Sequence, residues 1–122
     1  MSRSELLASV LADEATFVDT VRSLVELESP SHDRQATNRV ADLLVALLEG
    51  DGWRVERLPQ DEVGDVVIGR LEGGDPADGS LILAHDDTVW PLGTLAEMPW
   101  SFDGDVARGP GALDMKAGIA SA

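Results

Sequence analysis

The stretch Leu81–Pro91, with the sequence LILAHDDTVWP, decides the expected fold because an uninterrupted apolar run leads into a histidine and two aspartates. Four consecutive apolar residues, Leu81–Ala84, are typical of a central strand that is buried on both faces of a sheet. Ligand sites in α/β sheets form where such strands end. The stretch therefore predicts a central strand with a functional site beginning at His85.

His85 and Asp87 are two residues apart, so in an extended chain their side chains point to the same face. Asp87 can then accept a hydrogen bond from one imidazole nitrogen and leave the other nitrogen free to bind a metal. Asp86 would point the other way, and we expect it to be a solvated carboxylate. Taken alone, His85 is more often a structural or surface residue, and Asp87 could cap a turn with Thr88.

A second informative stretch is Gly109–Gly118, with the sequence GPGALDMKAG. Its first two glycines and its proline allow the backbone to pass close to another group, and Asp114 follows where a helix is expected to begin. A carboxylate with two oxygens can bridge two cations, as in two-metal hydrolases. Taken alone, Asp114 is more economically a helix N-cap. We expect Lys116 to pair with a nearby acid rather than to act in catalysis.

Helical periodicity covers most of the first fifty residues. It predicts helix over residues 4–28, with Ser4 as a cap and a division near Asp13, and the segment ends at Ser29–Ser31. A second helix is predicted over residues 34–49. Its expected buried stripe is Val40, Leu43, Leu44, Leu47 and Leu48.

The period then changes to that of strands. Alternation predicts strands at residues 53–58 and 66–71, and glycines with Pro76 predict a turn at residues 73–79. Residues 86–113 look mostly irregular, and a loop of that length is usually functional. Helices followed by mixed strands indicate an α/β layered domain.

The composition narrows the classes of partner. The chain has 122 residues, with 23 acidic and 9 basic ones and a formal net charge of −14, which argues against nucleic acid and anionic membranes. There is no cysteine, so a metal would need His, Asp and Glu ligands. The sequence shows neither a secretory signal nor a membrane-spanning run, and we expect a cytoplasmic protein.

Taken together, two stretches resemble a known family. HDDTVWPLGTL, from His85, and GDVARGPGALDMKAG, from Gly104, are similar to the zinc-dependent family of glutamate carboxypeptidases, acetylornithine deacetylases, succinyl-diaminopimelate desuccinylases and aminoacylases. The family pattern is His-x-Asp-x-Val followed by Gly-x-Gly-x-x-Asp-x-Lys, and both parts are present in order. LVELESPSHD, from Leu24, extends the likeness over nearly the whole chain. The Pro91–Leu95 run looks closest to the glutamate carboxypeptidase branch.

The resemblance implies a three-layer α/β/α zinc-peptidase-like catalytic domain, of which residues 1–122 would be the N-terminal part only. It implies two Zn²⁺ ions, with Co²⁺ or Mn²⁺ as substitutes, and His85 and Asp114 as metal ligands, Asp114 bridging both ions. Asp87 would be the carboxylate that orients His85, usually counted as catalytic. The resemblance also implies a cis peptide bond between Asp114 and Met115.

The family's Glu-Glu pair, its other metal ligands and its inserted dimerisation domain have no counterpart in the sequence, and Glu72 and Glu97 do not match them. We therefore expect no turnover by these residues alone. The intact protein would be a homodimer that cleaves amide bonds of small peptides or N-acyl amino acids. Two alternatives stay open: an inactive truncated module or interaction domain, and a deacylase of acetyl or succinyl amino acids. Truncation would leave Leu81–Ala84 partly uncovered.

Three other side chains near these motifs receive weaker expectations. Trp90 and Trp100 flank the expected site, and we expect them to be packing groups that could border a substrate pocket. His32, the other histidine, is expected to be a loop residue.

Overall fold

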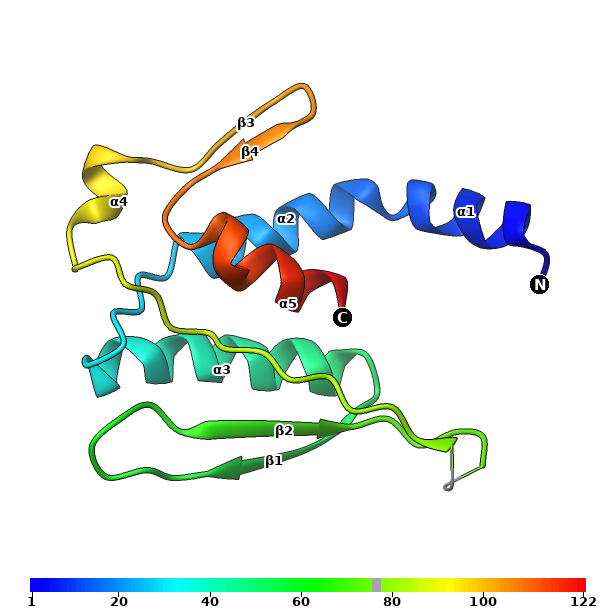
Figure 1. Ribbon diagram of the computed structural model, residues 1–122, viewed down its shortest axis with the longest axis horizontal. Coiled ribbons are helices and arrows are strands. Elements are labelled where there is room, and N and C mark those ends of the chain that lie inside the picture. The colour runs from blue at the N-terminus through cyan, green and yellow to red at the C-terminus, as the bar shows by residue number, and fades with distance from the viewer. Residues whose placement is uncertain (76–77) are drawn as a thin grey trace.

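A computed structural model of the protein describes residues 1–75 and 78–122, so Pro76 and Ala77 of the predicted turn lie outside the described residues. Figure 1 shows a long central helix with a two-stranded hairpin on one side and further helices on the other. The elements in chain order are α1 (Arg3–Ala12), α2 (Glu14–Val25), α3 (Arg34–Gly50), β1 (Arg54–Leu58), β2 (Val66–Arg70), α4 (Thr94–Glu97), β3 (Ser101–Asp103), β4 (Val106–Arg108), the wide turn η2 (Ala112–Lys116) and α5 (Ala117–Ser121). This mixture of helices and small sheets is an α/β arrangement, as predicted.

The first predicted helix is divided at Asp13, as expected, into α1 and α2. Its cap is Ser2 and not Ser4, because the Ser2 hydroxyl accepts from the Glu5 amide at 3.2 Å and the Glu5 carboxylate accepts from the Ser2 amide at 2.6 Å. Helix α1 buries none of its residues and projects from the molecule (Figure 1). Helix α2 buries the apolar face near its C-terminal end.

Helix α3 and the hairpin of β1 and β2 form a second packed unit. Asp33 caps α3 by accepting from the Ala36 amide at 2.9 Å, and α3 packs along the antiparallel hairpin. Arg57 fastens the two together, because its guanidinium donates to Asp65 at 2.7 Å and also pairs with Asp42 of α3. Of the predicted stripe on α3 only Val40 is fully buried, and the four leucines are half-buried.

The prediction of a central, doubly buried strand at Leu81–Ala84 is wrong for this chain. The segment is extended and runs alongside α3 (Figure 1), but no strand among residues 1–75 and 78–122 pairs with it. Leu81 and Leu83 are 83% and 81% exposed. Within the described part of the chain β2 pairs only with β1, so no strand lies beside this run and its side chains stay open to solvent. The expectation of a partly uncovered run is therefore met.

Residues 86–113 are more regular than predicted. They contain the short helix α4 and the hairpin of β3 and β4. Val21 and Val25 of α2 pack with Ala112 in the core, and Leu95 and Trp100 close over that cluster. This packing brings the two motif-bearing stretches to the C-terminal end of α2.

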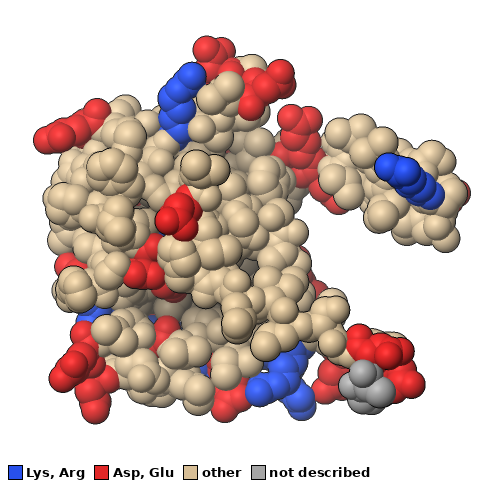
Figure 2. All heavy atoms as spheres, viewed as in Figure 1, with Lys and Arg blue, Asp and Glu red and all other residues tan. Residues whose placement is uncertain are grey.

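Charged side chains are spread over the surface. On the face shown in Figure 2, Asp and Glu lie over several elements, and Lys and Arg are few and separate. No helix in the described part of the chain has the length and apolar character needed to cross a membrane.

Candidate metal centre

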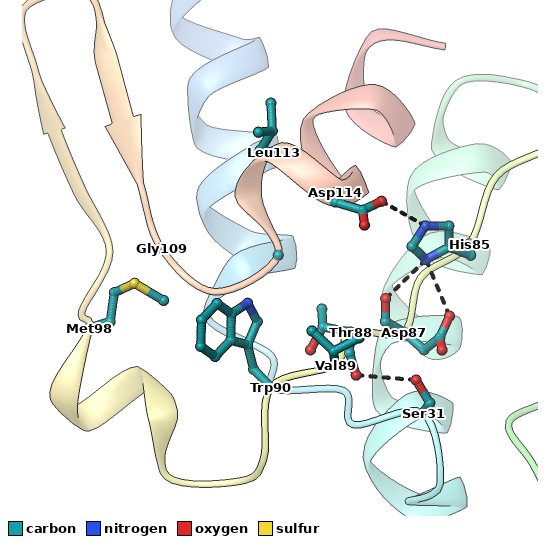
Figure 3. A pocket seen from close by; sticks show the side chains of 11 residues that line it. Ser31, His85, Asp87, Thr88, Val89, Trp90, Met98, Gly109, Leu113 and Asp114 are labelled. Carbon is teal, nitrogen blue, oxygen red and sulfur yellow. Dashed lines mark hydrogen bonds and ion pairs between the residues drawn. The ribbon is translucent and has the colours of Figure 1, made fainter.

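The side chains of His85 and Asp114, 29 residues apart in the chain, meet at the surface. His85 Nε2 lies 2.9 Å from Asp114 Oδ1 (Figure 3). The His85 side chain is about half exposed and that of Asp114 is 82% exposed. The structure thus brings together the two residues that the sequence singled out as metal ligands, in a place that solvent can reach.

The other imidazole nitrogen of His85 faces Asp87. Nδ1 lies 3.1 Å from the Asp87 carbonyl oxygen and 3.3 Å from its Oδ1 (Figure 3). Both neighbours are acceptors, so Nδ1 carries a proton and donates it to Asp87. Partial desolvation alone would lower the pKa of His85, but its contacts with Asp87 and Asp114 outweigh this and raise the pKa. Asp87 therefore lies where it can orient the imidazole.

The loop before Asp114 passes close to other backbone and side chains, as its glycines predict. A methyl group on Gly109 would overlap Val25, and one on Gly111, whose φ is 73°, would overlap Thr88. Asp114 is not a helix cap, because neither η2 nor α5 has a side-chain cap hydrogen bond. The Asp114–Met115 peptide bond is cis, as the resemblance implies.

A single segment supports the chain around His85. The Ser29 hydroxyl, fully buried, donates to the Asp86 carbonyl at 2.7 Å, and the Thr88 amide donates to the Ser29 carbonyl at 2.7 Å. The Ser31 amide and hydroxyl both contact the Thr88 carbonyl, at 3.1 and 3.2 Å. Pro30 and Thr88 consequently form a parallel bridge.

Two predictions about neighbouring charges are wrong. Lys116 does not pair with an acid: its side chain is buried, and Nζ donates to the carbonyls of Leu24 and Leu27 at 2.8 and 2.7 Å. Burial lowers the pKa of Lys116 to about 8, against the raising effect of Asp86 and Glu28. Asp86 is half-buried rather than solvated, and burial followed by the charge of Asp87 raises its pKa.

Glu28 holds the loop that follows His85. This role was not predicted from the sequence. Its carboxylate accepts from the amides of Gly93 and Leu95 at 3.0 and 2.8 Å. These two bonds, Leu95 first, lower the pKa of Glu28 below its ordinary value. The likeness at LVELESPSHD contained Glu28, Ser29 and Ser31, but a likeness gives no contact partners.

A cavity of about 390 Å³ opens beside the His85–Asp114 pair (Figure 3). Its polar side is formed by His85, Asp87 and Asp114, and its apolar side by Val89, Trp90, Met98 and Leu113. Trp90 lines this cavity, whereas Trp100 packs on the core. Exposed His32 lines a larger cavity of about 610 Å³ between α3, the β1–β2 hairpin and the Leu81–Ala84 run.

Known proteins with similar sequences decide the family. Carboxypeptidase G2 from Pseudomonas sp. (strain RS-16) is 32% identical over 121 residues, which are 97% of this chain and 29% of that protein. Succinyl-diaminopimelate desuccinylase from Rhodopseudomonas palustris (strain TIE-1) is 38% identical over 87 residues, 66% of this chain and 22% of the relative. The chain belongs to the peptidase and deacylase family that contains these two proteins. No protein-family model matches it.

Membership of the peptidase and deacylase family raises the question of a metal. Zinc binds His nitrogen and Asp oxygen, and His85 Nε2 and Asp114 offer one of each at an accessible surface. A catalytic zinc site uses three protein ligands and a water. Within residues 1–75 and 78–122 no third His, Asp or Glu joins the pair to make such a group. The residues fit two corners of a zinc site, and the chain spans less than a third of either relative.

Proposed function

We propose that the chain is the N-terminal part of the catalytic domain of a metal-dependent amidohydrolase with a three-layer α/β/α architecture. The observation that carries the proposal is the 2.9 Å approach of His85 Nε2 to Asp114 Oδ1 in a member of a peptidase and deacylase family. An imidazole and a carboxylate that converge at an exposed surface are the donors a zinc ion prefers.

In this proposal His85 and Asp114 would hold zinc, His85 as a ligand of one ion and Asp114 as a ligand shared by two, and Co²⁺ or Mn²⁺ could replace zinc. Bound zinc would supply an acidified water and would polarise the carbonyl of the substrate. Asp87 accepts the proton on Nδ1 of His85, which leaves Nε2, the nitrogen that faces Asp114, as the atom that would bind an ion. We expect the remaining ligands and the glutamate that takes the proton of water to lie in the part of the relatives that the chain does not span.

The proposed substrates are small peptides or N-acyl amino acids, whose amide bond is cleaved by the intact, homodimeric protein. The cavity beside the pair has an apolar side that includes Trp90 and Leu113, which suits an apolar group next to the scissile bond. A second candidate is removal of an acyl group such as succinyl or acetyl from an amino acid. The match to a desuccinylase favours this second candidate.

The test uses the full natural chain that contains these residues, loaded with zinc. We expect His85→Ala and Asp114→Ala each to lower the zinc stoichiometry and to reduce kcat/KM by at least about 100-fold, because each removes a ligand of the catalytic ion. Zinc content and the hydrolysis of an N-acyl glutamate and an N-succinyl amino acid are measured in parallel. The better of the two substrates separates the carboxypeptidase from the deacylase.

Matched controls are His32→Ala and Asp105→Ala, which remove the same chemical groups from exposed positions outside the pair. Both should keep the zinc content and rate of the unaltered protein. Unchanged zinc content and rates in the His85 and Asp114 variants would contradict the proposal. A full chain that folds, binds no zinc and hydrolyses neither substrate would favour the inactive module.

A further inference from the structure

Asp114 has little packing of its own to fix its position. Its side chain is 82% exposed, and its neighbour Leu113 is 94% exposed. The residues on either side, Ala112 and Lys116, are buried. The position of Asp114 therefore depends on how firmly these two flanking residues are held.

Lys116 holds the C-terminal side of the Asp114 loop by bonding two backbone carbonyls far away in the sequence. Its Nζ is 2.8 Å from the Leu24 carbonyl and 2.7 Å from the Leu27 carbonyl, 92 and 89 residues away in the chain. Carbonyls at the end of a helix lack intrahelical donors, and a cation is favourable there. The bond thus fastens the loop of Asp114 to the C-terminal end of α2.

The chain around His85 is fastened to the continuation of the same end. Ser29 binds the Asp86 carbonyl through its hydroxyl and the Thr88 amide through its carbonyl, both at 2.7 Å. The 24–31 segment, Leu24 to Ser31, therefore contacts the chain on both sides of the His85–Asp114 approach. Contacts of both stretches with the same segment restrict how far the two can move apart.

We propose that the 24–31 segment is the shared support of the metal-binding pair, and that Lys116 and Ser29 are positioning residues that hold Asp114 and His85 opposite each other. The proposal rests on the function proposed above, since it takes the pair to be metal ligands. Neither Lys116 nor Ser29 would touch metal or substrate. Each would act by keeping the ligand atoms at a separation that one ion can bridge.

The principal test compares Lys116→Met with two controls in the full natural chain. Arg22→Met removes an exposed cation from the last turn of α2, the helix whose end Lys116 contacts. Val40→Ala removes buried apolar atoms from α3. We expect Lys116→Met to weaken Co²⁺ binding at least tenfold and to change the Co²⁺ absorption spectrum. Arg22→Met should change neither, and Val40→Ala should lower Tm while keeping the Co²⁺ affinity.

Hydrogen exchange of the metal-free protein gives a readout that needs no ion. In Lys116→Met the amides of residues 116 and 117, which bond the Gly111 and Ala112 carbonyls, should exchange at least tenfold faster, and those of α3 should not change. If these amides exchanged at the rate of the unaltered protein, the positioning role of Lys116 would be contradicted, but the proposed function would not. A parent protein that binds Co²⁺ no better than Asp114→Ala would instead contradict the proposed function.

A second pair of variants decides the matter if Lys116→Met does not fold. Ser29→Ala removes the buried hydroxyl that binds Asp86, and Ser23→Ala removes an exposed hydroxyl that binds Asp19 within α2. Ser29→Ala should weaken Co²⁺ binding at least threefold, while Ser23→Ala should leave it unchanged. A folded Ser29→Ala or Lys116→Met variant with the affinity and spectrum of the parent would overturn the proposal.

Discussion

At position 111 the fold leaves no room for a methyl group. Gly111 has a φ of 73°, which disfavours any residue with a Cβ, and that Cβ would overlap Thr88 next to Asp87. We expect Gly111→Ala to lower the free energy of unfolding by at least about 2 kcal/mol, from backbone strain and overlap together. Urea unfolding followed by circular dichroism measures the loss.

Gly104 is the matched control for this prediction. Its φ is 61°, but a Cβ built there meets nothing within 4 Å. Gly104→Ala should therefore lower the free energy of unfolding by the contribution of backbone strain only, about 1 kcal/mol. Equal losses in the two variants would mean that the close approach to Thr88 has no energetic weight.

The family resemblance carried by the two motifs predicted which side chains lie together, but not which contacts hold them there. His85, Asp87 and Asp114 were singled out from residue type and order, and they are close together. Lys116 was expected to find an acid, and it binds two helix carbonyls instead. Because backbone acceptors are present at every residue, sequence cannot say which of them a buried ammonium will reach.

Among the elements, α4 depends on one distant carboxylate. Glu28 accepts from the amides of Gly93 and Leu95, and no intrahelical acceptor is available to the first amides of a helix. We expect Glu28→Gln to lower the free energy of unfolding by about 1 kcal/mol, because an amide oxygen is a weaker acceptor than a carboxylate. Faster hydrogen exchange at Gly93 and Leu95 should accompany the loss.

Glu26→Gln is the control for the same change of group. The Glu26 carboxylate pairs with Arg22 at 3.0 Å on the exposed side of the chain, and such pairs contribute about 0–1 kcal/mol. Exchange at Gly93 and Leu95 should be unaffected in this variant. If both variants changed exchange there equally, the two hydrogen bonds of Glu28 would not be the cause.

The Glu28 carboxylate predicts that the stability of the protein depends on pH. Its pKa in the folded protein is lowered from 4.5, so its ionised form favours folding. Its stabilising contribution is complete above the ordinary pKa and is lost as the pH falls through the lowered value. The stability difference between the parent and Glu28→Gln should therefore shrink between about pH 6 and pH 3. A difference that stayed constant over this range in urea titrations would contradict the assignment.

Periodicity predicted the regular elements well where contacts are local. The helices from α1 to α3 and the β1–β2 hairpin lie close to their predicted bounds. The run Leu81–Ala84 was expected to be a buried central strand, and in this chain it has no strand partner among the described residues. A local pattern predicts the extended, apolar character of the run, but it cannot say whether other strands lie beside it.

At the scale of the whole molecule, this unpaired run is the segment through which we expect two chains to associate. Leu81, Ile82 and Leu83 are 83%, 60% and 81% exposed, and an extended apolar run without strand partners can pair with another chain. We expect the 122-residue chain by itself to self-associate at micromolar concentration. The double variant Leu81→Lys and Leu83→Lys should shift it toward the monomer in sedimentation velocity, because lysines discourage edge pairing.

The matched control places the same two charges on another exposed apolar surface. Leu7 and Leu11 of α1 are 58% and 61% exposed, but the helix already satisfies its own backbone hydrogen bonds. If strand pairing drives association, Leu7→Lys with Leu11→Lys will leave the association constant within about twofold of the parent, whereas the strand variant will lower it at least tenfold. Equal effects of the two variants would mean that apolar exposure in general, and not the unpaired backbone, brings the chains together.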